Sequence, residues 1–169
     1  MAVNEMVSLL SAMKNRLDTQ LASITPAVVV AIGPLRRRDW PKFSRYLIEL
    51  RPGKVYREEQ PSATQYMNFY PVTIVVFVRR FWDDYKSAYG TEAGEIGVVV
   101  LCEMVQEAIN GVDLGPVWAI KAGGESQEID APLEDDEAGR YLETADLAVF
   151  YRVGIVNYLG HGKIRSIRT

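Results

Sequence analysis

The sequence contains few of the residues that most often carry catalysis or bind metals. Among its 169 residues there is one cysteine, Cys102, and one histidine, His161. A single cysteine excludes a disulfide within the chain, and one cysteine with one distant histidine makes a structural zinc site within one subunit unexpected. A Ser-His-Asp triad is poorly supported too, because His161 lies between two glycines near the C-terminus. We therefore expect no enzyme activity and no bound metal.

Other signals are missing as well. No apolar run approaches the roughly 20 residues that a helix needs to span a bilayer, and no basic segment precedes an apolar core at the N-terminus, as it would in a signal peptide. Gly123-Gly124 lacks the Lys and Ser/Thr of a phosphate-binding loop. The net charge of −3 argues against a dedicated nucleic-acid binder, which is usually basic. These absences predict a soluble protein, made in the cytoplasm, with no cofactor and no membrane partner.

The strongest signal that is present is the stretch 69–82, which reads FYPVTIVVFVRRFW. It is rich in β-branched and aromatic residues and predicts a long strand. Both faces of this strand are apolar as far as Arg79, so both faces must be covered. In a chain this short, another subunit is a candidate for the second cover. Assembly is therefore the main functional expectation.

Two amphipathic helices are predicted, one before that strand and one after it. Apolar residues recur at spacings of three and four over residues 3–24, and a Thr-Pro pair ends the pattern. The second helix is expected over residues 91–109, with Thr91 as its N-cap. Three consecutive valines at 98–100 also suit a strand and weaken this second prediction. Cys102 is expected to be a packed apolar residue of that helix.

Shorter strands complete the predicted fold. Alternating or continuous apolar residues place them at 27–32, 44–50, 115–121 and within 141–159. Gly154 is expected to mark a bulge or a bend in the last of these. The elements together predict one α+β domain over residues 1–169, with a mixed or antiparallel sheet and two main helices packed on one face. The basic segment 160–169 is expected to be a mobile tail, with its histidine at the surface.

A charged β-hairpin is expected over residues 44–59. The sequence Arg51-Pro52-Gly53-Lys54 has the proline and glycine of a type II turn, and it lies between two short extended stretches. Because these stretches are polar and long, the hairpin would project from a small core. The candidate contact residues of this hairpin are Arg51, Lys54 and Arg57.

Two further charged clusters are each open to more than one interpretation. Residues 36–38 are three arginines, followed by Trp40, and could grip phosphate or an acidic partner, or form a solvated loop. The acidic run at 134–137 is typical of a solvated loop. Its acids are consecutive, so it lacks the alternating ligand positions of a calcium-binding loop.

The order of the elements resembles that of the tail terminator (tail-completion) proteins of long-tailed bacteriophages. The resemblance is one of layout over most of the chain, and it rests on four stretches: MVSLLSAMKNRLDTQLASI, YPVTIVVFVRR, GVVVLCEMVQEAI and ETADLAVFYRVGIVNYL. It implies helices packed on a mixed or antiparallel sheet, no catalytic residues, and a homohexameric ring at the head-proximal end of the tail tube. Such a ring stops tube polymerisation and docks the head-closure protein of the neck, while DNA passes through its lumen without sequence readout. The implied location is the virion, after synthesis in the host cytoplasm.

Two surfaces receive candidate roles on this basis. A ring contact joins two different complementary patches, and Trp, Tyr and Arg are typical interface anchors. The charged aromatic end of the long strand is therefore a candidate assembly surface, made of Arg79, Trp82, Asp83, Asp84 and Tyr85. An acidic lumen would repel DNA and let it slide. The candidate residues for the lumen or its rim are Glu134, Asp135, Asp136 and Glu137.

Two other functions stay open on the sequence. A different neck component, such as a head-closure or adaptor protein, would share the setting but contact the portal side. A small cytosolic enzyme or ligand-binding α+β domain is the third possibility. Six-fold rings of the purified protein would favour the first two over the third, and binding to tail tubes rather than to portal-bearing heads would separate the first from the second.

Overall fold

The computed structural model describes residues 4–59, 64–80, 84–114, 117–118, 127–129 and 150–166. Its helices are α1 (Glu5–Gln20), the short 3-10 helix η1 (Arg37–Asp39), α2 (Asp84–Tyr89) and α3 (Val98–Ile109). Its strands are β1 (Val28–Ile32), β2 (Tyr46–Pro52), β3 (Tyr56–Glu59), β4 (Gln65–Arg79), β5 (Asp113–Leu114), β6 (Val117–Trp118), β7 (Gln127–Ile129), β8 (Tyr151–Gly162) and β9 (Arg165–Ser166).

One mixed sheet organises the chain, in the order β1-β2-β4-β8-β6-β5. β1 and β2 run parallel, and the other pairs are antiparallel. β4 is the longest strand, with 15 residues, and it lies between β2 and β3 on one side and β8 and β9 on the other. The predicted α+β class is confirmed, with the apolar stretch 69–79 at the centre of the sheet.

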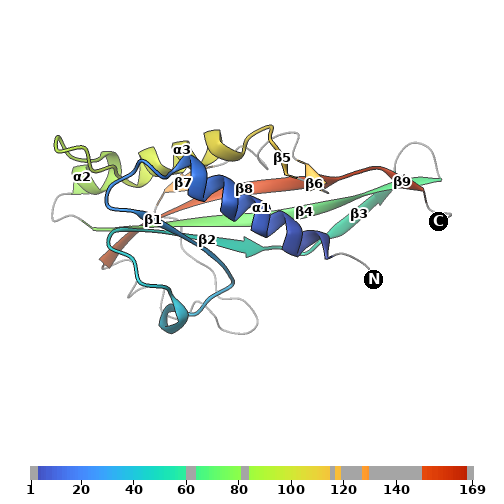
Figure 1. The fold of residues 1–169 in the computed structure, drawn as a ribbon, viewed down its shortest axis with the longest axis horizontal. Helices are drawn as coiled ribbons and strands as arrows, with labels where there is room; N and C mark the ends of the chain where they lie inside the picture. The colour runs from blue at the N-terminus through green and yellow to red at the C-terminus, as the bar shows by residue number, and fades with distance from the viewer. Residues whose placement is uncertain are drawn as a thin grey trace.

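Both long helices cover the same face of this sheet (Figure 1). α1 begins at Asn4, whose side chain accepts a hydrogen bond from the backbone N–H of Val7 at 3.2 Å. Its buried residues pack in one core with those of α3 and with the inward residues of β4, and Arg16 donates to the carbonyl of Ala108 at 2.8 Å. The β4 residues in this core are Tyr70, Val72, Ile74, Val76 and Val78. The prediction of two main helices on one face is confirmed.

The second helix starts later than its sequence pattern predicted. Residues 90–97 are not helical, and the three valines at 98–100 form the first turn of α3. Tertiary packing outweighs their β propensity, since Val98 is fully buried against the sheet. Gly154 explains how closely α3 approaches β8, because a Cβ atom there would lie 2.3 Å from the Sγ atom of Cys102. Cys102 is a packed core residue, as expected.

The other face of the sheet is covered by the chain itself near the end of β4. Residues 33–45, which include η1, cross this face and bring Trp40 and Phe43 onto it. The Trp40 ring centroid lies 4.7 Å from that of Phe77 and 5.7 Å from that of Tyr151. The second cover, for which another subunit was a candidate, is therefore supplied here by the 33–45 segment. We call this part of the sheet, between the helices and the 33–45 segment, the covered end.

The prediction of a hairpin over residues 44–59 is wrong, because the chain does not reverse its direction there. β2 and β3 do not pair with each other; both pair antiparallel with β4, from Tyr46 opposite Val78 to Glu59 opposite Tyr66. At the predicted turn, residues 53–55 oppose only residues 70–71, which makes a β-bulge in an otherwise continuous edge. The Gly53 N–H donates to the Pro71 carbonyl at 2.7 Å. The chain reverses between β3 and β4 instead, so the projecting hairpin is β3–β4.

The predicted mobile tail is also corrected. β8 continues to Gly162, and β9 then pairs with the first residues of β4, with Arg165 opposite Tyr66. His161 is half-buried opposite Phe69 rather than at the surface. Of the strand predicted at 115–121 the described part is β6, and residues 141–149 of the last predicted strand lie outside the described residues.

Candidate assembly surfaces and an arginine-lined cavity

The sheet extends well beyond both helices at the end where β3 and β9 lie (Figure 1). We call this extension, residues 55–59, 65–71 and 159–166, the distal arm. Each flank of β4 has a bulge here: residues 53–55 oppose residues 70–71 at the root of the arm, and residues 162–164 oppose residues 67–68 within it. Such bulges bend the bulged strand and increase the local twist of the sheet.

An aromatic row runs across one face of the distal arm. The rings of Tyr56 and Phe69 stack with centroids 5.0 Å apart and planes 10° apart, and His161 meets the same Phe69 edge-on at 4.9 Å. On the other face the Arg57 guanidinium lies 3.8 Å from the ring centroid of Tyr66. These contacts link β3, β4 and β8, so side-chain pairs hold the arm together in place of a helix.

The outer edge of the distal arm is open within the part of the chain that the structure describes. β3 pairs only with β4 there, and all four of its residues are exposed. Tyr56 is 42% exposed, Val55 40% and Ile164 51%. An open strand edge is a template for pairing with another chain, and Tyr56 gives this one an exposed aromatic side chain beside three charged residues.

The arm is fastened to α1 through one carboxylate. Glu5, in the first turn of α1, accepts a hydrogen bond from the Tyr70 hydroxyl and forms an ion pair with Arg165 of β9.

Partial burial lowers the pKa of His161, although the nearby Glu58 opposes the shift. His161 is therefore neutral at physiological pH, which suits its edge-on contact with Phe69.

The three predicted contact residues of the charged hairpin separate in the structure. Lys54 and Arg57 are exposed, at the bulge and on β3. Arg51 is only partly exposed, and its Nε atom lies 3.9 Å from an oxygen of Glu49. Lys54 and Arg57 thus belong to the surface of the distal arm, whereas Arg51 faces a buried carboxylate.

Glu49 is the polar residue whose importance the sequence did not reveal. It is completely buried in β2, and its Oε2 atom accepts a hydrogen bond from the Leu35 N–H at 2.8 Å. Gly33 lies so close to it that a Cβ atom there would be 2.8 Å from the carboxylate. Glu49 therefore pins the start of the 33–45 segment to the sheet. An acidic residue inside an apolar strand was the available signal.

The predicted assembly surface at the end of the long strand is described only in part. Trp82 and Asp83 lie outside the described residues, and of Asp84 only the backbone, at the start of α2, is described. Tyr85 is 70% exposed and lies against Tyr89, itself 54% exposed, with ring centroids 5.0 Å apart. Arg79 is exposed at the end of β4, on the face of Phe77. The structure therefore supplies an exposed tyrosine pair on α2, which packs beside α3 on the helix side.

The acidic run at 134–137 lies outside the described residues. Its placement at a ring lumen or rim stays a prediction.

Arg79 instead joins two other arginines at a cavity of about 440 Å³. The cavity is lined by Arg37, Arg79, Arg80, Phe150 and Tyr151. η1 supplies Arg37, whose guanidinium lies 5.7 Å from the ring centroid of Phe150 and 5.9 Å from that of Tyr151. The register of β4 and β8 places Arg79 opposite Tyr151, and the Arg80 N–H donates to the Phe150 carbonyl at 2.7 Å.

The three consecutive arginines at 36–38 have different surroundings in the structure. Arg37 turns onto the two rings, while Arg36 and Arg38 are exposed and Arg38 approaches Asp39 at 3.8 Å. Trp40 packs on Phe77 and is part of the second core. Of the predicted cluster, one arginine therefore lies at a cavity and the other two lie on the surface beside it.

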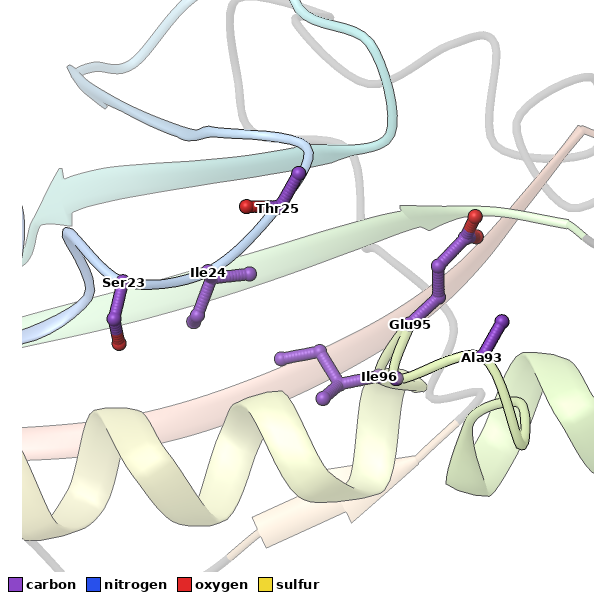
Figure 2. A pocket seen from close by; sticks show the side chains of 7 residues that line it. Ser23, Ile24, Thr25, Ala93, Glu95 and Ile96 are labelled. Carbon is purple, nitrogen blue, oxygen red and sulfur yellow. The ribbon is translucent and has the colours of Figure 1, made fainter.

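A second crevice, of about 460 Å³, lies between the α1–β1 connection and the α2–α3 loop (Figure 2). Ile24 and Thr25 line one side of it, Glu95 and Ile96 line the other, and the Ile96 side chain points toward Ile24. The Glu95 carboxylate forms an ion pair with Arg45 at 3.1 Å, which joins the α2–α3 loop to the residue just before β2.

The described residues contain no group of three or more His, Cys, Asp or Glu side chains that could hold a metal ion. Burial raises the pKa of the Cys102 thiol to about 12, so this cysteine is protonated and inert at neutral pH. In the part of the chain that the structure describes, no helix is long and apolar enough to cross a membrane. Neither models of known protein families nor curated proteins give a match to this chain.

Proposed function

We propose that this chain is the subunit of a homo-oligomeric ring of the tail terminator type, which caps the tail tube of a long-tailed bacteriophage. The observation that carries the proposal is the distal arm. It is an extended, bulged part of the sheet that reaches beyond the helices and exposes an open strand edge, with the side chains of Val55 and Tyr56 exposed at its start. A part of this kind is suited to pairing with a neighbour.

A closed ring needs two different complementary patches on each subunit. The distal arm offers one of them. The tyrosine pair of α2, Tyr85 and Tyr89, offers an exposed aromatic surface at the opposite end of the sheet (Figure 1). Tyrosine is enriched among the residues that dominate interface energies. Two distinct patches at opposite ends support a head-to-tail arrangement over a two-fold dimer.

The resemblance in layout supplies the rest of the proposal. The ring stops polymerisation of the tail tube, docks the head-closure protein, and lets DNA pass without sequence readout. A formal charge of −3 for each subunit suits a conduit to which DNA does not adhere. A head-closure or adaptor role at the portal side is the alternative assignment of such a ring.

Electron microscopy of the purified protein tests the assembly. We expect six-fold rings, and we expect the double variant Val55→Glu/Tyr56→Glu to weaken assembly by at least about tenfold, because it places charge on the open edge. Val7→Glu is the control, since Val7 is 55% exposed on α1 and this variant adds a negative charge to an exposed position outside the sheet edge. A wild-type protein that stays monomeric at high concentration would contradict the proposal.

An assay with polymerising tail tubes distinguishes a tail terminator from a head-closure or adaptor protein. Purified rings added to growing tubes should bind their ends and stop elongation, and deletion of the gene should give overlong tails or tails without heads. Binding to portal-bearing heads with no effect on tube length would assign the ring to the head-closure or adaptor role instead.

A further inference from the structure

The distal arm has an open edge on each side within the part of the chain that the structure describes. β1 ends at Ile32, opposite Leu50, so no described strand lies outside β3. On the other flank β6 extends only to the level of Gly162, so no described strand lies outside β9. The sheet is therefore reduced to β3, β4 and β9 at its tip (Figure 1). These two edges add a second pair of candidate patches to the proposed ring, which needs two different surfaces that meet.

The two edges carry opposite charges at the same level of the arm. Glu58 and Glu59 are exposed at the end of β3, and Lys163 and Arg165 are exposed on the β9 flank. Tyr66 of β4 lies opposite Glu59 on one side and opposite Arg165 on the other. Residues directly opposite each other in antiparallel strands share a face of the sheet. These three side chains therefore form one row across the arm, acidic at one edge and basic at the other.

Contacts within the subunit leave these edge charges available. Neither Glu59 nor Lys163 has an ion-pair partner among the described residues. Arg57, the one basic residue of β3, lies over an aromatic ring of its own subunit. Arg165 forms an ion pair with Glu5, but its side chain is 48% exposed. Because a guanidinium has several N–H donors, Arg165 can bind a second carboxylate without losing the first.

We propose that the β3 edge of one subunit pairs with the β9 flank of the next, so that neighbouring distal arms join into one continuous sheet. This inference rests on the proposed ring and names the partner of the open edge, which is a second copy of the same chain. β3 and β9 are both antiparallel to β4, so they run in the same direction and would meet as parallel strands. The rotation that relates neighbours in a head-to-tail ring brings such strands together without reversing either one.

Exposed apolar side chains lie at both edges as well. Tyr56 is exposed on β3, and Ile164 is exposed on the β9 flank. Burial of these side chains between two arms would supply affinity. The charged pairs would mainly fix the register and the choice of partner, with Glu59 of one subunit beside Arg165 of the next.

Charge-reversal variants of the full chain, alone and mixed, test the pairing. Glu58→Lys/Glu59→Lys makes the β3 edge basic, and Lys163→Glu places a negative charge on the β9 flank while leaving the contact between Arg165 and Glu5 in place. We expect each variant alone to assemble at least about tenfold more weakly than wild type, because like charges then meet. An equal mixture of the two variants should regain most of the wild-type assembly, since each altered edge then meets an edge of opposite charge. Mass photometry measures the assembled fraction.

The matched control is Glu103→Lys/Glu107→Lys, which makes the same change of charge at exposed positions of α3 and should alter assembly less than about twofold. Thermal melting of each variant confirms that it is folded. A second measurement needs no variant, because a carbodiimide joins a carboxylate to a lysine that contacts it. Cross-linking a mixture of isotopically labelled and unlabelled wild-type protein should give peptides that join Glu58 or Glu59 of one subunit to Lys163 of another.

The outcomes distinguish this inference from the proposed ring. Wild-type rings without the mixed-isotope cross-link, or a mixture that assembles as weakly as its components, overturn the pairing and leave the proposed ring standing. Normal assembly of Lys163→Glu beside weak assembly of Glu58→Lys/Glu59→Lys would mean that β3 pairs with itself or with another protein, and overturns the pairing too. A control that weakens assembly as much as these variants would assign the effect to net charge and has the same consequence. Wild-type protein that stays monomeric and gives no such cross-link overturns both proposals.

Discussion

The two halves of β4 have very different surroundings. From Val72 to Val78 the strand lies under the two helices, and at Phe77 it also lies under the 33–45 segment. From Gln65 to Pro71 it lies in the distal arm, with an exposed β3 on one side and the end of β8 and the short β9 on the other. One continuous strand thus joins a part that is sealed on both faces to a part held by cross-strand side-chain pairs. The fold is stabilised mainly at the covered end, which leaves the arm available for a partner.

The largest effect on stability is expected when the two phenylalanines on the same face of β4 are each replaced by alanine and the losses are compared. Phe77 is fully buried at the covered end, and Phe69 is 8% exposed in the arm. Phe77→Ala should lower the free energy of unfolding by about 3–5 kcal/mol, because Trp40 and Tyr151 cannot fill the cavity. Phe69→Ala should cost about 1–2 kcal/mol, since its neighbour Tyr56 is half-exposed and can relax. Urea unfolding measures both, and equal losses would remove the distinction between the two ends.

The next effect concerns the buried carboxylate that fastens the 33–45 segment. Glu49→Ala leaves the Leu35 N–H without its acceptor and should destabilise the fold by about 2–3 kcal/mol. Glu49→Gln keeps an acceptor and should restore part of that loss. Glu59→Ala, on the exposed β3, removes the same charge in the arm and should stay within about 0.5 kcal/mol of wild type. If Glu59→Ala costs as much as Glu49→Ala in the same urea titrations, the 33–45 segment is not held by Glu49.

The elements with strong local patterns were predictable, and those decided by distant pairing were not. The helical periodicity of α1 and the β-branched run of β4 each carry their own signal. The Pro-Gly pair at 52–53 is compatible with a turn and with a bulge, so the local sequence does not distinguish the two. What decides between them is the register of β2 and β3 against β4, which the local sequence does not contain. The same reason hid the pairing of β9, since basic residues near a terminus look solvated.

The candidate sites follow the same division. The sequence marked three arginines and a tryptophan together, but the direction of each side chain depends on how the 33–45 segment crosses the sheet. The sequence placed Arg79 at the end of the predicted strand, but only the fold brings Arg79 and Arg37 to the same cavity. Exposed aromatic residues such as Tyr56 became recognisable as an open edge once β3 was placed outside β4.

A smaller effect should appear in the arm when the pH is changed. Burial lowers the pKa of His161 in the folded chain below its ordinary value of about 6.5. The unfolded chain therefore binds the proton more readily, so the contribution of His161 is fully present above about pH 6.5 and is lost as the pH falls toward the folded pKa. Hydrogen exchange at pH 7.5 and pH 5.5 should show faster opening of β3 and β9 at the lower pH. His161→Gln should abolish that difference, and a response confined to the covered end would assign it to other groups.

The smallest effect is expected from two buried tyrosines whose hydroxyl groups differ. The Tyr46 hydroxyl donates to the Ile96 carbonyl at 2.9 Å and accepts from the Ile96 N–H at 3.0 Å, which holds the α2–α3 loop on β2. The Tyr158 hydroxyl has no hydrogen-bond partner among the described residues, and burial raises its pKa. Tyr158→Phe should therefore leave the melting temperature unchanged or raise it slightly, whereas Tyr46→Phe should cost about 1–2 kcal/mol. A marked loss in Tyr158→Phe would mean that this hydroxyl, where β8 passes from the covered end toward the arm, has a partner that contributes to joining them.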